Sequence, residues 1–184
     1  VDGQDGAKYK SFETKEEATK AFEKGYEHYL KTASSSKAAA GLTPKTPVGK
    51  PIWESLCVDA ACSGNPGNME YRGVYPPTMQ EIFRIGPLKK GTNNIGEFLA
   101  LVHGLALLKQ KGSSLPIYSD SRNAIGWVKK KKCKTLLERV PENEPIFDMI
   151  ERAEKWLKTN TYTTPILKWE TSEWGEIPAD FGRK

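Results

Sequence analysis

The sequence predicts an α/β domain in which a mixed sheet of five strands is flanked by helices, with a small αβ segment in front of it. Beyond residue 52, apolar runs of strand length come first, and runs of helix length then alternate with further strand-like runs. Strands joined by tight turns pair antiparallel, whereas strands separated by a helix pair parallel, so this combination predicts a mixed sheet. A stretch rich in Ser, Ala and Pro sets this part apart from the first thirty residues.

Residues 1–31 contain one strand-like and one helical pattern. Thr14 and Glu17 form a capping box at the start of a helix whose apolar residues recur at helical spacing. One strand and one helix are too little for an independent core, so this unit is expected to be part of a module. Residues 32–51 predict a flexible linker, which leaves 52–184 as the larger domain.

The larger domain begins with strand-like segments. Apolar residues predict strands over 53–61, 69–75 and 80–86, and the turn residues of Ser63–Gly67 separate the first two. The segment 94–109 is apolar nearly all round, which is typical of a buried helix. The remaining expected elements are a strand over 115–119, a helix over 121–131, an amphipathic helix around 146–157, a strand over 165–170 and a short terminal helical segment that contains Asp180.

Composition narrows the class of protein. The net charge of +5 suits a polyanionic substrate, although such a value is also ordinary for a soluble protein. The 3 cysteines lack metal-ligand spacing and predict free thiols in a reducing, cytoplasmic compartment. No apolar run approaches transmembrane length and the first residues are polar, so neither a membrane span nor a signal peptide is expected.

Four carboxylates carry the chemical signal: Asp59, Glu97, Asp120 and Asp180. Three of them sit beside hydrophobic segments, where an ionised group is costly unless a positive charge neutralises it. Because histidines are few and no CxxC pair is present, a hard divalent cation held by oxygen atoms is the natural partner. Each carboxylate alone also has a structural explanation, as a turn cap, a helix cap or an ion-pair partner. Together they predict metal-assisted phosphodiester chemistry.

The segments around these carboxylates resemble the catalytic domain of type 1 ribonuclease H. The resemblance covers residues 53–184, and its four motifs occur in the family's order. They are Val58-Asp59 with the Ser63–Gly67 loop, Gly91-Thr92-Asn93-Asn94 leading to Glu97, Tyr118-Ser119-Asp120-Ser121, and Trp174-Gly175-Glu176 leading to Asp180. Residues 1–31 resemble the C-terminal half of the hybrid-binding domain that is often fused to such enzymes, so that domain is expected to be partial.

The resemblance implies an endoribonuclease that cuts the RNA strand of RNA–DNA hybrids by two-metal-ion hydrolysis and leaves 5′-phosphate and 3′-hydroxyl ends. Two Mg²⁺ ions, with Mn²⁺ as a possible substitute, would be bridged by Asp59, while Asp120 and Asp180 complete the shells of opposite ions. Glu97 would bind metal and also meet a ribose 2′-hydroxyl. Glu176 stands in the loop where many relatives carry a catalytic histidine, which resembles a bacterial subgroup whose Glu assists metal exchange and product release.

The family's substrate contacts can be carried over position by position. Those matching RNA contacts are Cys62, Gly64, Asn65 and Asn93, and those matching a phosphate pocket for the DNA strand are Thr92, Asn94 and Thr135. Arg122 occupies a position where close relatives often have Gln. In the N-terminal segment, Lys8, Tyr9 and Lys10 resemble hybrid-binding positions. The expected partner is an RNA–DNA hybrid, with no membrane, no obligate protein partner and a monomeric state.

Two alternatives remain open from the sequence. The first is a DNA-acting nuclease or transferase on the same scaffold, which cleavage of an all-DNA duplex would favour. The second is a non-catalytic hybrid-binding module, which metal-dependent turnover would exclude.

Overall fold

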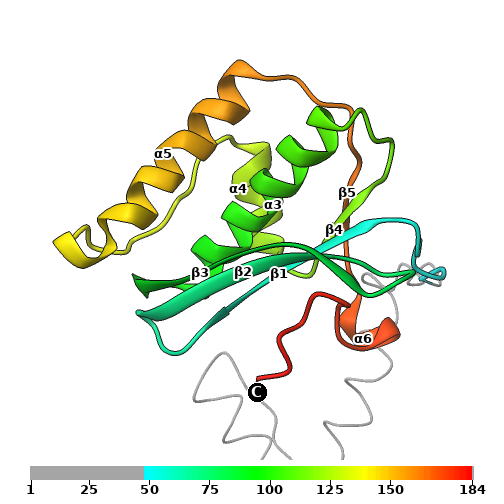
Figure 1. Cartoon of the computed structure of the whole chain (residues 1–184), viewed down its shortest axis with the longest axis horizontal. Helices are drawn as coiled ribbons and strands as arrows, with labels where there is room; N and C mark the ends of the chain where they lie inside the picture. Colours follow the sequence, from blue (N-terminus) through cyan, green and yellow to red (C-terminus); the bar gives the residue numbers. More distant parts are fainter. Residues whose placement is uncertain (1–47, 184) are drawn as a thin grey trace, which may run out of the picture. The chain divides into compact units, whose positions relative to one another are not determined.

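One mixed sheet organises the part of the chain that the structure, a computed structural model, describes, namely residues 48–183 (Figure 1). The strand and helix expected within residues 1–31 lie outside these described residues. The described elements, in chain order, are β1 (Leu56–Cys62), β2 (Gly67–Tyr75), β3 (Gln80–Gly91), α3 (Asn93–Gln110), β4 (Ile117–Ser119), α4 (Arg122–Lys129), the short 3-10 helix η2 (Pro141–Asn143), α5 (Glu144–Thr159), β5 (Ile166–Lys168) and α6 (Thr171–Trp174).

The sheet has the strand order β3-β2-β1-β4-β5. The pairs β1–β2 and β2–β3 are antiparallel, whereas β1–β4 and β4–β5 are parallel. The two short connections join the antiparallel strands, and the helices α3, α4 and α5 lie in the connections of the parallel ones. The predicted fold class, a five-stranded mixed sheet flanked by helices, is therefore confirmed.

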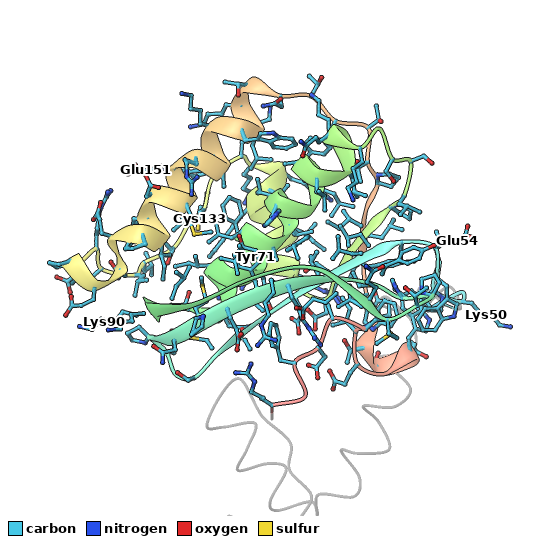
Figure 2. All side chains as sticks on the ribbon, in the orientation of Figure 1. Lys50, Glu54, Tyr71, Lys90, Cys133 and Glu151 are labelled. Carbon is cyan, nitrogen blue, oxygen red and sulfur yellow. The ribbon has the colours of Figure 1, made fainter. Side chains whose placement is uncertain are left out.

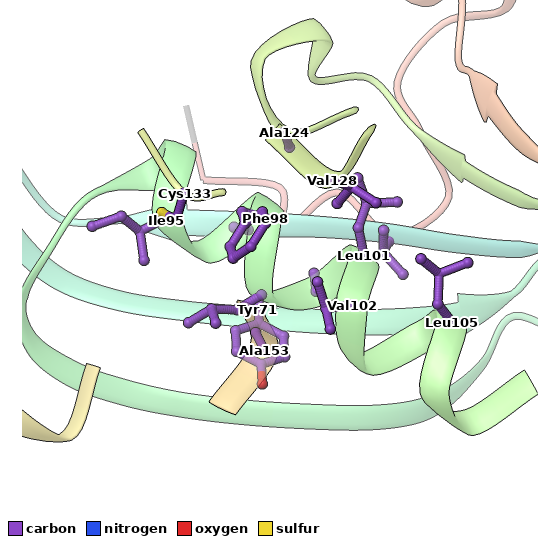
Figure 3. Close-up of a cluster of buried hydrophobic side chains, with 14 of the residues drawn as sticks. Tyr71, Ile95, Phe98, Leu101, Val102, Leu105, Ala124, Val128, Cys133 and Ala153 are labelled. Carbon is purple, nitrogen blue, oxygen red and sulfur yellow. The ribbon is translucent and has the colours of Figure 1, made fainter. Parts of the chain in front are cut away.

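The two faces of the sheet have different coverings. Helices α3, α4 and α5 lie on one side, whereas α6 and the end of the described chain lie on the other (Figure 1). Alternate β1 residues, including Val58 and Ala60, join the large core beneath the helices. Tyr71 of β2 belongs to the same core (Figure 3). Cys57, which precedes Val58 in β1, belongs to a second, smaller cluster on the opposite face. Asp59 shares the alternation of Cys57, so the sheet carries its first acidic side chain on the face opposite α3.

Helix α3 is the central helix, and residues all round its surface are buried, as its sequence predicted. His103 lies on this helix. Its ring stacks on Phe83 with the ring centroids 4.0 Å apart, and the hydroxyl of Tyr71 lies 3.3 Å from its Nδ1 atom. Tyr71 lies between the sheet and α3 in Figure 2. Burial lowers the pKa of His103, which suits a neutral packing residue.

Several predicted boundaries were wrong by a few residues. Strand β1 begins at Leu56 rather than residue 53, because Leu56 is the first residue paired with β4. Strand β3 continues to Gly91 through Pro87, because an edge strand does not need the N–H that proline lacks. Strands β4 and β5 and helix α4 are shorter than predicted, whereas β2, α3 and α5 are longer. The terminal helix lies at Thr171–Trp174, so the segment with Asp180 is not helical.

The predicted linker reaches into the described residues only at its end. Residues 48–51 have no regular structure, as expected, yet the carbonyl of Gly49 accepts a hydrogen bond of 2.8 Å from Trp174 Nε1. The proposed domain limits stay predictions. Within residues 48–183, no helix combines the length and the apolar character needed to cross a bilayer.

Candidate active site

Four acidic residues from four places in the chain line one cavity. Asp59 lies within β1, Glu97 near the start of α3, and Asp120 directly after β4. Because β1 and β4 are parallel neighbours, Asp59 and Asp120 extend from adjacent strands toward the same end of the sheet. Asp180 arrives from the end of the chain, after α6.

Three of these side chains form a tight group. One oxygen atom from each of Asp59, Glu97 and Asp120 lies within 4.8 Å of the others. They line a cavity of about 410 Å³, whose wall also includes Asp180 and Asn93. Asp180 is outside the group of three, yet its negative charge helps to raise the pKa of Asp59. The wall of this cavity therefore carries all four of the predicted carboxylates.

The site strongly disfavours negative charge in the absence of a cation. Burial, followed by the charge of Asp120, raises the pKa of Asp59 to about 8. Burial also raises the pKa of Glu97 to about 7, with the charge of Asp120 adding to the effect. Hydrogen bonds from Ser121 and Asn93 act in the opposite direction on Glu97. A divalent cation would remove the repulsion, and carboxylate oxygens are the ligands that hard cations prefer, so the donor set fits such an ion.

Two neighbours orient Glu97. Asn93 Nδ2 donates to Glu97 Oε1 at 2.8 Å, and Ser121 also hydrogen-bonds to this carboxylate. The Ser121 hydroxyl caps α4 as well, since it accepts from Ala124 N at 3.1 Å. Sequence reasoning assigned Asn93 to RNA contact and gave Ser121 no part in the site. The position of Ser121 directly after Asp120 was the only available signal for it.

A glycine permits the close approach of α3 to β1. A Cβ atom on Gly96 would lie 2.7 Å from the Cβ of Ala60, which is closer than two carbon atoms can pack. These residues are the chain neighbours of Glu97 and Asp59. The missing side chain therefore lets the helix bring its carboxylate to the strand.

A second hollow lies beside the acidic cavity, and it has a volume of about 450 Å³. Its wall contains Thr92, Asn94 and Thr135, the three residues expected to form a phosphate pocket. It also contains Lys134 and Trp127. The remaining wall residues are Asn65, Leu136 and Leu137. Asn65 was expected among the RNA contacts and instead lines this hollow.

Other predicted residues fall at different places. Cys62 lines the acidic cavity, where its thiol donates to the carbonyl of Gly64 at 2.8 Å. Arg122 is exposed at the first position of α4 and lines neither hollow. Glu176 is exposed in the bend after α6 and is not part of the cavity wall. The last three predicted residues, Lys8, Tyr9 and Lys10, lie outside the described residues.

Comparison with known proteins assigns the family. The RNase H family model matches residues 54–168, well over half of the chain. The chain belongs to the RNase H family. The matched range of this RNase H chain includes Asp59, Glu97 and Asp120 and ends before Glu176 and Asp180.

Curated relatives carry the name Ribonuclease H. One from Rhodopirellula baltica is 41% identical over 75 residues, which is 40% of this chain and 46% of that protein. One from Rickettsia bellii is 31% identical over 137 residues, which is 68% of this chain and 83% of that protein. The match to the first of these thus spans about half of its length. Among solved structures, the N-terminal RNase H domain of a Mycobacterium tuberculosis protein has 15% identity and a TM-score of 0.41, covering 65% of this chain and 89% of that chain.

Proposed function

We propose that this chain is a ribonuclease H that cuts the RNA strand of RNA–DNA hybrids by metal-assisted hydrolysis and leaves 5′-phosphate and 3′-hydroxyl ends. The observation that carries the proposal is the group of three carboxylates, from β1, α3 and the end of β4, within 4.8 Å of one another in an open cavity. Membership of the RNase H family supports the same reaction.

We assign metal binding to Asp59, Glu97, Asp120 and Asp180, with Mg²⁺ as the natural ion and Mn²⁺ as a substitute. Two bound divalent ions supply Lewis-acid chemistry, which makes the attacking water more acidic and stabilises charge on the leaving oxygen. Asp59 is central, because it is buried and its pKa responds to the charges of the other three carboxylates. Glu97 is held by Asn93 and can therefore also meet a ribose 2′-hydroxyl in a fixed orientation.

The two hollows suggest how the two strands of a hybrid are told apart. The acidic cavity would receive the RNA strand, where the 2′-hydroxyl distinguishes ribose from deoxyribose. The proposed RNA contacts are Cys62 and Asn93, which line this cavity, and Gly64, whose carbonyl accepts a hydrogen bond from the Cys62 thiol. The DNA strand would place a phosphate in the second hollow.

The second hollow offers donors suited to a phosphate. The hydroxyls of Thr92 and Thr135 each accept a hydrogen bond from a backbone N–H, at 3.4 and 3.1 Å, and so keep their own O–H to donate. Asn94 and Lys134 add an amide and a cation to the same wall. We propose that Lys134 and Trp127 also contact the DNA strand in this hollow. Asn65 lines the same hollow, so we assign it to the DNA strand rather than to the RNA strand.

Three further assignments belong to the proposal. Glu176 would assist metal exchange and product release from its exposed position after α6, and Arg122 would contact nucleic acid from α4. The N-terminal residues Lys8, Tyr9 and Lys10 would add weak hybrid binding. We expect a monomer that acts in the cytoplasm without an obligate protein partner.

A cleavage assay tests the proposal. End-labelled RNA, paired with DNA, paired with RNA or unpaired, is incubated in Mg²⁺ beside an all-DNA duplex. The variants are Asp120→Asn and, as a matched control, Asp148→Asn, whose carboxylate is exposed on α5. We expect cutting of the hybrid RNA alone, lost with EDTA and in Asp120→Asn but kept in Asp148→Asn. Cutting of the all-DNA duplex would instead identify a DNA-acting nuclease, and binding without cutting would identify a binding module.

A further inference from the structure

Asp180 is the one proposed metal-binding carboxylate that lies beyond the last regular element of the described residues. The chain leaves α6 at Trp174 and continues through residues 177–183 without helix or strand. The position of the Asp180 carboxylate therefore depends on how this tail segment, residues 177–183, attaches to the face of the sheet opposite α3. Figure 1 shows the tail segment on the side of the sheet opposite α3.

Arg72 of β2 makes the polar attachment. Its Nε atom donates to the carbonyl oxygen of Ala179 at 2.8 Å, and its Nη2 atom donates to the carbonyl oxygen of Asp180 at 2.5 Å. Arg72 is also the cross-strand partner of Asp59 in the β1–β2 pair. The residue that grips the tail segment thus lies directly beside the central carboxylate of the cavity.

The two carbonyls that Arg72 binds belong to the peptide units on either side of the Asp180 Cα atom. When both peptide planes are held, the backbone dihedrals of Asp180 are fixed, and with them the direction of its Cα–Cβ bond. A guanidinium group suits this task, because its donors form a rigid planar fork. A single donor would hold only one of the two planes.

The apolar and ring contacts of the tail segment hold neighbours of Asp180 rather than Asp180 itself. Ile177 and Ala179 are buried in the small cluster on this face. The Phe181 ring lies 4.8 Å from the Arg72 guanidinium carbon and 5.3 Å from that of Arg84. These contacts bring the segment to the sheet, whereas Arg72 binds the peptide units on both sides of Asp180 and ties them to β2.

We propose that Arg72 is a positioning residue for Asp180, which it holds at the cavity wall so that the carboxylate takes part in binding a divalent cation. The inference rests on the proposed function for its consequence in catalysis, while its structural part stands on the contacts of Arg72 alone. The backbone amides of Asp180 and Gly182 report directly on whether Asp180 is held in place. Asp180 N donates to Ile177 O at 2.8 Å, and Gly182 N donates to Asp180 Oδ2 at 2.9 Å.

The test compares Arg72→Met and Arg72→Lys with the control Arg84→Met. Arg84 lies over the same Phe181 ring and pairs with Glu70, so its loss removes a cation from the same face. In Arg72→Met we expect faster hydrogen exchange at the Asp180 and Gly182 amides and about tenfold weaker Mn²⁺ binding by calorimetry. Arg72→Lys should be intermediate, because the lysine ammonium can donate to the carbonyls but lacks the rigid planar fork of the guanidinium group. Arg84→Met should resemble the wild type in both measurements.

Activity provides the second readout. For Arg72→Met, the Mg²⁺ concentration for half-maximal cleavage should rise about tenfold, while hybrid affinity in EDTA stays within about twofold of the wild type because the proposed nucleic-acid contacts remain. Unchanged amide exchange and Mn²⁺ affinity in Arg72→Met would overturn the inference, as would an equal loss in Arg84→Met. If the wild type cuts no hybrid, the proposed function fails, whereas the exchange and Mn²⁺ measurements still decide the role of Arg72.

Discussion

Replacement of Asp59 by asparagine removes a charge that the folded, metal-free protein has to bury. Asp59 is 6% exposed, and its pKa is raised to about 8 by burial and by the neighbouring carboxylates. In the unfolded chain the group has its ordinary pKa near 3.8. Between these two values the folded state binds more protons than the unfolded state, so the free energy of unfolding must fall as the pH rises.

The size of this effect follows from the two pKa values. At about 1.4 kcal/mol per pKa unit, the difference between about 8 and 3.8 sets an upper limit of about 6 kcal/mol. Water reaches the carboxylates through the open cavity and screens part of the repulsion, so we expect about 3 kcal/mol. The stabilising effect of the protonated group is fully present below pH about 4 and is lost as the pH passes about 8. The side-chain amide of the Asp59→Asn variant cannot ionise, so the variant lacks this loss.

Urea unfolding in EDTA at pH 5 and pH 8.5 measures the difference. We expect the wild type to lose stability over this range and Asp59→Asn to exceed it at pH 8.5 by about 3 kcal/mol. Mg²⁺ at ten times its Kd should restore about 1.4 kcal/mol to the wild type and little to the variant. Asp148→Asn, a change at an exposed aspartate of α5, is the control and should follow the wild type. A variant no more stable than the wild type in EDTA at pH 8.5 would refute the reasoning.

Three other substitutions test the packing, the orientation of Glu97 and the second hollow. Gly96→Ala should lower the free energy of unfolding by about 1–3 kcal/mol, measured by thermal unfolding, because the added Cβ clashes with β1. Gly126→Ala is the control and should cause no such loss, because no atom lies within 4 Å of its added Cβ. Equal losses in the two variants would contradict the packing argument. Ser121→Ala should lower kcat about tenfold in steady-state assays, because the hydrogen bond to the Glu97 carboxylate is lost. Ser121→Thr keeps a hydroxyl and should retain most of the wild-type kcat. A low kcat in Ser121→Thr would point to a packing effect instead. Lys134→Met should weaken hybrid binding and reduce the number of counterions released on binding by about one. Lys158→Met on α5 is the control and should change neither quantity. If the salt dependence of binding is unchanged in Lys134→Met, Lys134 is not part of the interface.

Local patterns predicted most elements of the fold. The all-round apolar segment became α3. The two turn-linked runs after β1 became β2, which pairs antiparallel with β1, and β3, which pairs antiparallel with β2. The boundaries that failed are those set by tertiary pairing. Leu56 starts β1 because β4 pairs with it there, and Pro87 lies within β3 because β3 is at the edge of the sheet. Neither fact is visible in the residues themselves.

The sequence by itself determined which carboxylates to examine, because each lies in a short motif of residues that are adjacent in the chain. It also indicated Thr92, Asn94 and Thr135, which the structure gathers in one hollow. Only the tertiary structure brought Ser121 to Glu97 and placed Arg72 beneath Asp180. Arg72 is 107 and 108 positions away from the two residues whose carbonyls it binds. A contact of that kind depends on strand register and on the path of a non-helical segment, and neither is encoded in any local pattern.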